Sequence, residues 1–202
     1  MAMLEKTEAL EPDSYREILG RFPSKTILVV GDLVADEFVF GEISRVSREA
    51  PVLILKHRRS QIVPGGGANA VNNLAELGAR VLPVGVVGDD PAGQALLNCF
   101  RDKGIEVRGI AVQKGFPTVT KTRILAGTVH GSRQQVLRID REPGHPVSSA
   151  RRAQIARRAL AVVNRADAVL ISDYGYGAAT PQLAQALRRQ SGGRLLTVDS
   201  RY

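Results

Sequence analysis

The stretch IVPGGGANAVNNLAELGA, at residues 62–79, combines residue types that suit the binding of a small polar ligand. Glycines lack a Cβ atom, so a ligand can approach the backbone, and exposed N–H groups at a helix start favour anions or hydroxyl oxygens. Asparagine is a weaker helix former than Lys, Gln or Glu, yet its amide suits a polyhydroxylated ligand because it both donates and accepts hydrogen bonds. A solvated helix face is the alternative interpretation. The residues concerned are Gly65, Gly66, Gly67, Asn69, Asn72 and Asn73.

Carboxylates follow several of the predicted strands. Ligands of open α/β sheets bind beyond the carboxyl ends of the strands, so these acids predict a polar crevice. A single aspartate in such a place is more often a turn or cap residue, and Asp90, which precedes Pro91, reads as a helix cap. The full set is Asp32, Asp36, Asp89, Asp90, Asp173 and Asp199.

Two cations occur at alternate positions in the segment TVTKTRIL, at residues 118–125. In a strand, Val119, Lys121 and Arg123 share one face. A solvent-facing sheet surface is one interpretation of this pattern. The other is a clamp for a phosphate, in which arginine contributes a planar fork of donors.

The elements that must position these residues alternate between strand and helix. Buried-strand patterns end in Gly-Asp or Asp, and helical patterns of about 10–15 residues separate them, which predicts a three-layer α/β domain with a mostly parallel sheet. Gly78 should stop the first helix, and Ser148 or Ser149 should cap the third. The predicted strands are 25–32, 80–90, 105–112, 166–173 and 194–200, and the predicted helices 67–79, 92–104, 151–164 and 180–190.

Four further strand-like segments do not fit this alternation. Residues 36–43 and 51–63 read as strands, and 118–125 and 134–140 read as an antiparallel pair around a Gly-rich turn. We predict that they form a small β-flap outside the main sheet. The first 24 residues or so read as an appendage.

Composition excludes several classes of protein. The chain has 202 residues, of which 44% are hydrophobic and 24% charged, as in an ordinary globular protein. No apolar run approaches the roughly 20 residues of a membrane-spanning helix, and the N-terminus lacks the apolar core of a secretory signal. The single cysteine, Cys99, excludes an internal disulfide and a thiolate metal cluster. We expect a soluble cytoplasmic protein without a membrane partner.

The net charge of +8 suits either nucleic acid or small phosphorylated ligands. Only 4% of the residues are aromatic and none is Trp, which argues against a stacking platform for single strands. Much of the excess charge lies in RRAQIARR, at 151–158, which reads as a solvated helix face. We therefore expect no nucleic-acid partner.

The segments GGGANAVNNLAELGA and VGVVGDD together resemble the N-terminal signature of the PfkB-type, ribokinase-like sugar kinases. Within that family, the chain is most similar to the heptose-7-phosphate kinases of ADP-heptose synthesis. The resemblance covers nearly all of the chain after residue 25. The segments that support it are VVGDLVADEFVFGEISRVSREAPV, the Gly-rich stretch, TVTKTRIL with SRQQVLRID, and LISDYGYGA.

The resemblance implies a ribokinase-like three-layer sandwich over 25–202, with a β-lid at about 37–63 and 118–140. It implies an enzyme that uses ATP and Mg²⁺ to phosphorylate D-glycero-D-manno-heptose 7-phosphate at its anomeric hydroxyl, for a lipopolysaccharide precursor. It also implies a homodimer formed through the lid. A kinase of another sugar, sugar phosphate or nucleoside, and a non-catalytic sugar-phosphate-binding protein, are the alternatives.

The resemblance also implies roles for individual residues. Asp36 corresponds to the ligand of a sugar hydroxyl, and Asp173 lies near the region of phosphoryl transfer. The sugar-binding turn and helix start would comprise Gly65, Gly66, Gly67 and Asn69. The cations expected to face the substrate or its phosphate are Lys121, Arg123, Arg133 and Arg138.

Two features depart from the family pattern. Tyr176 stands where the subgroup often has a lysine. The family's Gly-Ala-Gly-Asp segment, which supplies the catalytic base and an anion hole, and its nucleotide-binding region would lie beyond residue 202, and no Walker-type loop replaces them. We therefore expect the N-terminal portion of a kinase, with the C-terminal part missing, no catalytic residue within the chain, weak substrate binding and no turnover.

Overall fold

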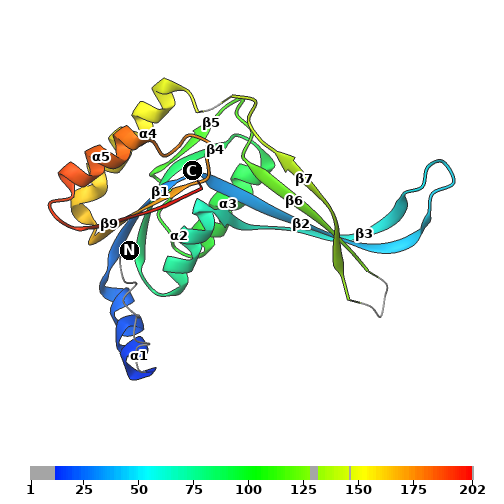
Figure 1. The fold of residues 1–202 in the computed structure, drawn as a ribbon, viewed down its shortest axis with the longest axis horizontal. Coiled ribbons are helices and arrows are strands. Elements are labelled where there is room, and N and C mark those ends of the chain that lie inside the picture. Colours follow the sequence, from blue (N-terminus) through cyan, green and yellow to red (C-terminus); the bar gives the residue numbers. More distant parts are fainter. Residues whose placement is uncertain (1–11, 128–131, 146, 202) are drawn as a thin grey trace, which may run out of the picture.

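The computed structural model describes residues 12–127, 132–145 and 147–201. Its main sheet has five strands in the order β5-β4-β1-β8-β9, and every neighbouring pair is parallel (Figure 1). A Cβ at Gly31 would lie 2.1 Å from the backbone oxygen of Ser172, so glycine is required where β1 meets β8. The strands are β1 (Thr26–Gly31), β4 (Arg80–Gly88), β5 (Ile110–Gln113), β8 (Ala168–Asp173) and β9 (Leu195–Ser200).

Helices cover both faces of this sheet, which confirms the predicted three-layer α/β fold. Successive β1 side chains point to opposite faces. Leu28 and Val30 belong to the core beneath α4 and α5, whereas Val29 belongs to the core beneath α2 and α3. The helices are α2 (Gly67–Glu76), α3 (Pro91–Asp102), α4 (Ser149–Val162) and α5 (Pro181–Gln190).

The helix boundaries follow from capping residues. Asp90 accepts a hydrogen bond from the Gly93 N–H at the start of α3, and Ser148 caps α4, as predicted. Gly78 has a φ of 92°, a left-handed conformation that favours glycine and ends α2.

A second sheet of four strands, which we call the β-lid, extends away from the helices (Figure 1). Its order is β3-β2-β6-β7, with β2 and β6 parallel and the outer pairs antiparallel. The antiparallel pairing predicted for the last two strands is confirmed; residues 128–131 of their Gly-rich turn lie outside the described residues. The strands are β2 (Leu33–Val46), β3 (Leu53–Gly66), β6 (Thr120–Gly127) and β7 (Gln134–Arg141).

The first two lid strands are longer than predicted. β2 begins at Leu33, directly after Asp32, and β3 continues to Gly66. Asp36 lies within β2, as the predicted strand at 36–43 required, and it stands opposite Val63 of β3. The glycine-rich turn is in fact the end of β3 and the start of α2.

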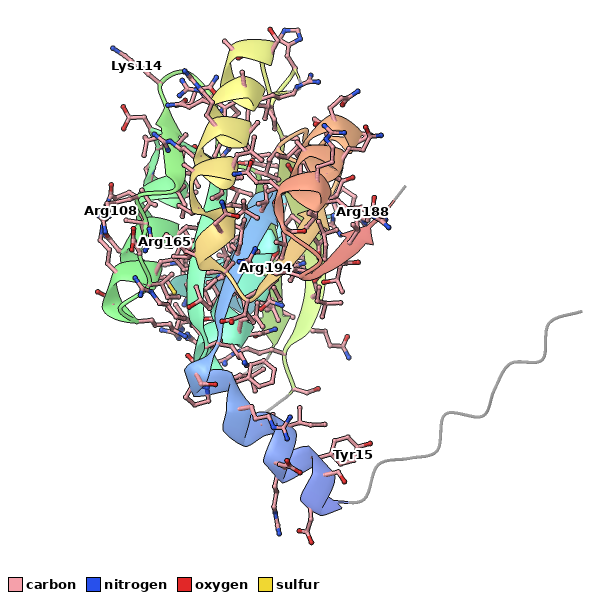
Figure 2. The ribbon with its side chains drawn as sticks, turned by 90° about the vertical axis from the view of Figure 1, so that its left-hand side faces the viewer. Tyr15, Arg108, Lys114, Arg165, Arg188 and Arg194 are labelled. Atoms are coloured by element: carbon pink, nitrogen blue, oxygen red, sulfur yellow. The ribbon has the colours of Figure 1, made fainter. Side chains whose placement is uncertain are left out.

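The appendage predicted for the first 24 residues contains helix α1 (Pro12–Arg21) and a 3₁₀ turn at Phe22–Ser24; residues 1–11 lie outside the described part. Helix α1 points away from the main sheet, and its Tyr15 is exposed (Figure 2). No helix in the described part of the chain has the length and apolar character that a membrane span requires.

The basic segment at 151–158 is part of α4. This helix buries Ile155, while Arg157 is exposed and Arg152 donates to the backbone oxygen of Val147. Other cations on this side of the molecule are spread over separate elements and do not form one cluster (Figure 2). The arrangement supports the interpretation as a solvated helix face.

Candidate substrate site

A hollow of about 290 Å³ lies where the β-lid meets the carboxyl ends of the main-sheet strands. Asp36 and Asn69, which the sequence predicts as partners of a polyol, both line it. So do the cations expected to face a phosphate, with the exception of Arg133. The complete lining is Val34, Asp36, Gly65, Gly66, Asn69, Lys121, Arg123, Arg138, Tyr174 and Arg201.

The three glycines allow close packing of the chain. A Cβ at Gly65 would lie 2.6 Å from Asp36 Oδ2, so glycine leaves room for that carboxylate. Gly66 has a φ of 52°, and a Cβ at Gly67 would lie 2.8 Å from the backbone oxygen of Asp32. Gly65 and Gly66 line the hollow, whereas Gly67 packs against the chain at Asp32 and does not line it.

Only the first of the three asparagines lines the hollow. Asn72 accepts a hydrogen bond of 2.6 Å from Lys103 Nζ, and Asn73 is exposed without lining the hollow. The prediction that the three amides act together is therefore wrong. Asn73 lies one helical turn, about 6 Å, further along the axis from Asn69, which takes it away from the lid.

The carboxylate of Asp36 is held by a neighbouring cation. Arg123 Nη1 lies 2.5 Å from Asp36 Oδ1, and about a quarter of each side chain is exposed. The Arg123 guanidinium also stands over the Phe38 ring, with its carbon 5.5 Å from the ring centroid. A hydroxyl that binds Asp36 must therefore share this carboxylate with Arg123.

Two further cations share a single carboxylate. Arg138 donates two hydrogen bonds to Asp140, of 2.6 and 2.5 Å, and Lys121 Nζ lies 3.6 Å from Asp140. The hydrogen bond from Arg138 lowers the pKa of Asp140 below its usual value. Four cations and one carboxylate line the hollow, so its electrostatic potential favours an anionic ligand.

A second hollow, of about 350 Å³, adjoins the first. The two share Lys121, Arg138, Tyr174 and Arg201 in their walls. These residues thus form the boundary between two neighbouring spaces. The remaining lining of the second hollow is Asp140, Glu142, Pro143, Gly144, His145, Gly175 and Tyr176.

Three of the predicted site residues lie outside both hollows, namely Gly67, described above, Arg133 and Asp173. Arg133 stands over the Phe40 ring, with its guanidinium carbon 5.6 Å from the ring centroid. Asp173 accepts hydrogen bonds of 3.0 Å from the Gly175 N–H and from the Ser200 hydroxyl, so one of its oxygens holds the turn after β8 and the other holds the end of β9. The hollow therefore contains one of the predicted strand-end acids, Asp36, and not the row of carboxylates expected from the sequence.

Asp32 has a role that the sequence did not indicate. It is buried and accepts hydrogen bonds of 2.9, 3.1 and 2.9 Å from the backbone N–H groups of Tyr174, Tyr176 and Ala178. Burial raises the pKa of Asp32 above its usual value, against these hydrogen bonds. Asp32 thus fixes the loop that carries Tyr174 into the wall of the hollow. In the sequence, Gly175 and Gly177 were the available sign of a tight loop after this strand, and both have a positive φ in the structure.

The described residues hold no group of three or more His, Cys, Asp or Glu side chains that could bind a metal ion.

A profile of the pfkB family carbohydrate kinases matches residues 24–187 of the sequence. The chain belongs to this family. Two similar proteins are both named bifunctional protein HldE. The one from Wolinella succinogenes is 43% identical over 170 residues, which cover 84% of this chain and 35% of the relative. The one from Desulfatibacillum aliphaticivorans is 39% identical over 180 residues, which cover 88% of this chain and 36% of the relative. The pfkB chain thus spans about a third of these relatives.

Solved structures of pfkB-type kinases share the ribokinase-like fold. Phosphofructokinase-2 from Escherichia coli, in complex with substrates and products, matches with a TM-score of 0.62 and 17% identity over 87% of this chain and 54% of that one. Ribokinase from Arabidopsis thaliana, complexed with ribose and ATP, matches with a TM-score of 0.58 and 20% identity over 87% of this chain and 53% of that one. The pfkB chain spans about half of each.

Proposed function

We propose that this chain forms the substrate-binding part of a carbohydrate kinase whose substrate is a sugar phosphate. The observation that carries the proposal is the hollow in which Asp36 and Asn69 lie beside Lys121 and Arg138. Acceptors and amides for hydroxyl groups thereby stand next to cations for a phosphate. A kinase of an unphosphorylated sugar or of a nucleoside would not need these cations.

The chain's own residues would act by positioning. Catalysis of phosphoryl transfer depends chiefly on orientation and on electrostatic stabilisation. Asp36, Asn69 and the backbone at Gly65 and Gly66 would orient the sugar ring. Lys121 and Arg138 would hold its phosphate, and the lid would exclude water from the reacting hydroxyl.

The sugar we propose is D-glycero-D-manno-heptose 7-phosphate, with its anomeric hydroxyl as the acceptor. The support is the sequence resemblance to heptose-7-phosphate kinases and the similarity to two proteins named HldE. A fructose or ribose derivative is the alternative within the fold.

ATP and Mg²⁺ are the cosubstrate and the ion that this family membership suggests. ATP would supply the transferred phosphoryl group. We assign neither to particular residues, because no cluster of metal ligands occurs among those that the structure describes. The residues of the hollow suit a sugar phosphate, and all the roles proposed here concern that ligand.

A second copy of the chain is the partner we propose for the lid. Leu137 and Ile139 lie at alternate positions of the edge strand β7, so they share a face, and about half of each side chain is exposed. Val52 and Leu53, beside the turn between β2 and β3, are similarly exposed. Light scattering should detect a dimer that Leu137→Lys with Ile139→Lys converts to a monomer; a wild-type monomer at high concentration would contradict the idea.

Calorimetric titration of the chain with heptose 7-phosphate tests the main proposal. We expect saturable binding, with binding of unphosphorylated heptose at least about tenfold weaker because the charge-assisted hydrogen bonds to the phosphate are lost. Equal affinity for the two sugars would contradict the proposal. Tighter binding of fructose 6-phosphate than of heptose 7-phosphate would show that the substrate is a fructose phosphate and not the heptose. Coupled ADP release should show no turnover by these 202 residues, which contain no Gly-Ala-Gly-Asp segment. Turnover would overturn that expectation.

A further inference from the structure

Three interactions from different parts of the fold converge on Tyr176. Its backbone N–H donates to Asp32 Oδ2 at 3.1 Å, and its hydroxyl donates to Glu142 Oε1 at 2.6 Å. Lys121 Nζ donates to the Tyr176 hydroxyl oxygen at 3.3 Å. The side chain therefore joins the loop between β8 and α5 to strand β6 and to the residue that follows β7.

The direction of these hydrogen bonds is fixed by chemistry. A phenol has one hydrogen, and a carboxylate such as that of Glu142 can only accept. The hydrogen of Tyr176 therefore points at Glu142, and its oxygen lone pairs are available to the Lys121 ammonium. Burial, together with the hydrogen bond to Glu142, raises the pKa of Tyr176 above that of an ordinary phenol, so the donor is retained at neutral pH.

We propose that Tyr176 is a positioning residue, which holds the ammonium group of Lys121 at the boundary of the two hollows so that it can bind the phosphate of the substrate. The binding role of Lys121 rests on the function proposed above. The arrangement in which Glu142 orients the Tyr176 hydroxyl and that hydroxyl holds Lys121 does not depend on the proposed function.

The surroundings of Lys121 show what this positioning achieves. Only 11% of its side chain is exposed, and it lines both hollows. Among the described residues, the hydroxyl of Tyr176 and the carboxylate of Asp140 engage its ammonium group. An ammonium has three N–H donors, so at least one remains for a ligand. A lysine side chain that is already ordered loses less conformational entropy when the ligand binds.

A lysine at position 176 could not play this part. Two neighbouring ammonium groups would repel each other, whereas the tyrosine offers Lys121 an oxygen acceptor that lies 3.3 Å from Nζ.

The first test needs no ligand. In ¹⁵N-labelled protein, the Lys121 ammonium should give a resolved, slowly exchanging NMR signal, which the variant Lys121→Arg identifies by its disappearance. Tyr176→Phe keeps the ring and removes the hydroxyl, so the signal should broaden or vanish at nearly unchanged melting temperature. Glu142→Gln, which retains an acceptor oxygen, should preserve it. The matched control is Tyr15→Phe, on the exposed helix α1. An unchanged Lys121 signal in Tyr176→Phe, or no signal in the wild type, would overturn the proposal.

The second test uses heptose 7-phosphate as the probe. We expect Tyr176→Phe to bind it about three- to tenfold more weakly than the wild type, the usual effect of losing one hydrogen bond. If the wild type does not bind this probe, the proposed substrate fails while the NMR result still decides whether Tyr176 holds Lys121. If the signal changes and the affinity does not, Lys121 is held by Tyr176 but does not bind the phosphate, and the positioning role is refuted.

Discussion

Arg123 and Asp36 form an ion pair of 2.5 Å across the parallel strands β6 and β2. They are diagonal neighbours, because Asp36 lies opposite Lys121 in the sheet register and Arg123 lies opposite Phe38. The pair therefore links two neighbouring positions on one face of the lid. It places a carboxylate and a guanidinium together in the wall of the hollow.

Asp36→Asn should weaken the binding of heptose 7-phosphate by about tenfold or more, because it removes the charged acceptor that we propose for a sugar hydroxyl and the partner of Arg123. Arg123→Gln should have a smaller effect. Since the two side chains touch, the double variant should lose less affinity than the sum of the single losses. Calorimetry on all four proteins gives this coupling, and strictly additive losses would show that the pair does not act as a unit in the site.

Gly65→Ala should displace the Asp36 carboxylate, because the new Cβ would lie 2.6 Å from Asp36 Oδ2. Forcing extra volume into packed structure costs about 1–3 kcal/mol, so we expect a lower denaturant midpoint as well as weaker sugar binding. Gly20→Ala on α1 is the matched control, since nothing lies within 4 Å of that position and alanine favours a helix. Equal effects of the two substitutions would contradict the prediction.

Arg138 and Arg133 should respond differently to removal of their charge. Arg138 lines both hollows, whereas Arg133 lies against Phe40, outside them. Arg138→Gln should weaken heptose 7-phosphate binding by about tenfold or more, the effect of losing a charge-assisted hydrogen bond. Arg133→Gln should leave it unchanged in the same titration. A loss of affinity in Arg133→Gln would restore the role that the family resemblance suggested for this residue.

Asp90 should make stability depend on pH in acid. Burial alone would raise the pKa of Asp90, but hydrogen bonds from Thr118 and Gly93 outweigh it and lower the pKa below its usual value. A lowered pKa in the folded state means that the stabilisation is present above the unfolded-state pKa and is lost as the pH falls through the folded-state value.

Urea denaturation between pH 7 and pH 3 measures this effect. The wild type should lose its advantage over Asp90→Asn as the carboxylate becomes protonated, below about pH 4. At neutral pH the difference should be about 1 kcal/mol, because the amide nitrogen of asparagine cannot accept the hydrogen bonds that one of the two Asp90 oxygens receives from Thr118 and Gly93. A difference that does not vary with pH would show that the charge of Asp90 contributes nothing.

Local patterns in the sequence predicted most of the fold. The apolar run at 25–32 indicated a buried strand, and Asp90 followed by Pro91 indicated a helix start, because both depend only on neighbouring residues. The two-residue period of Lys121 and Arg123 placed both side chains in the wall of the same hollow. Predictions of this kind hold in the tertiary structure because the local pattern determines which face of a strand or helix is buried.

The remaining site residues depend on contacts between distant segments. Asn72 carries the same amide as Asn69, but Lys103, 31 residues further along the chain, binds it. Tyr174 and Arg201 line the hollow because β8 and β9 end beside the lid. The residues next to them in the sequence do not indicate this position. Arg133 looked equivalent to Arg138, yet it lies near the far end of β6 and β7, next to an aromatic ring.

A single residue, Asp32, separates the last residue of β1 from the first residue of β2. Its backbone therefore belongs to the junction between the two sheets. Its carboxylate accepts hydrogen bonds from the loop between Tyr174 and Ala178. One residue thus ties the base of the lid to the loop that carries Tyr176, so a substitution of Asp32 should disturb both the junction of the two sheets and the support that we propose for Lys121.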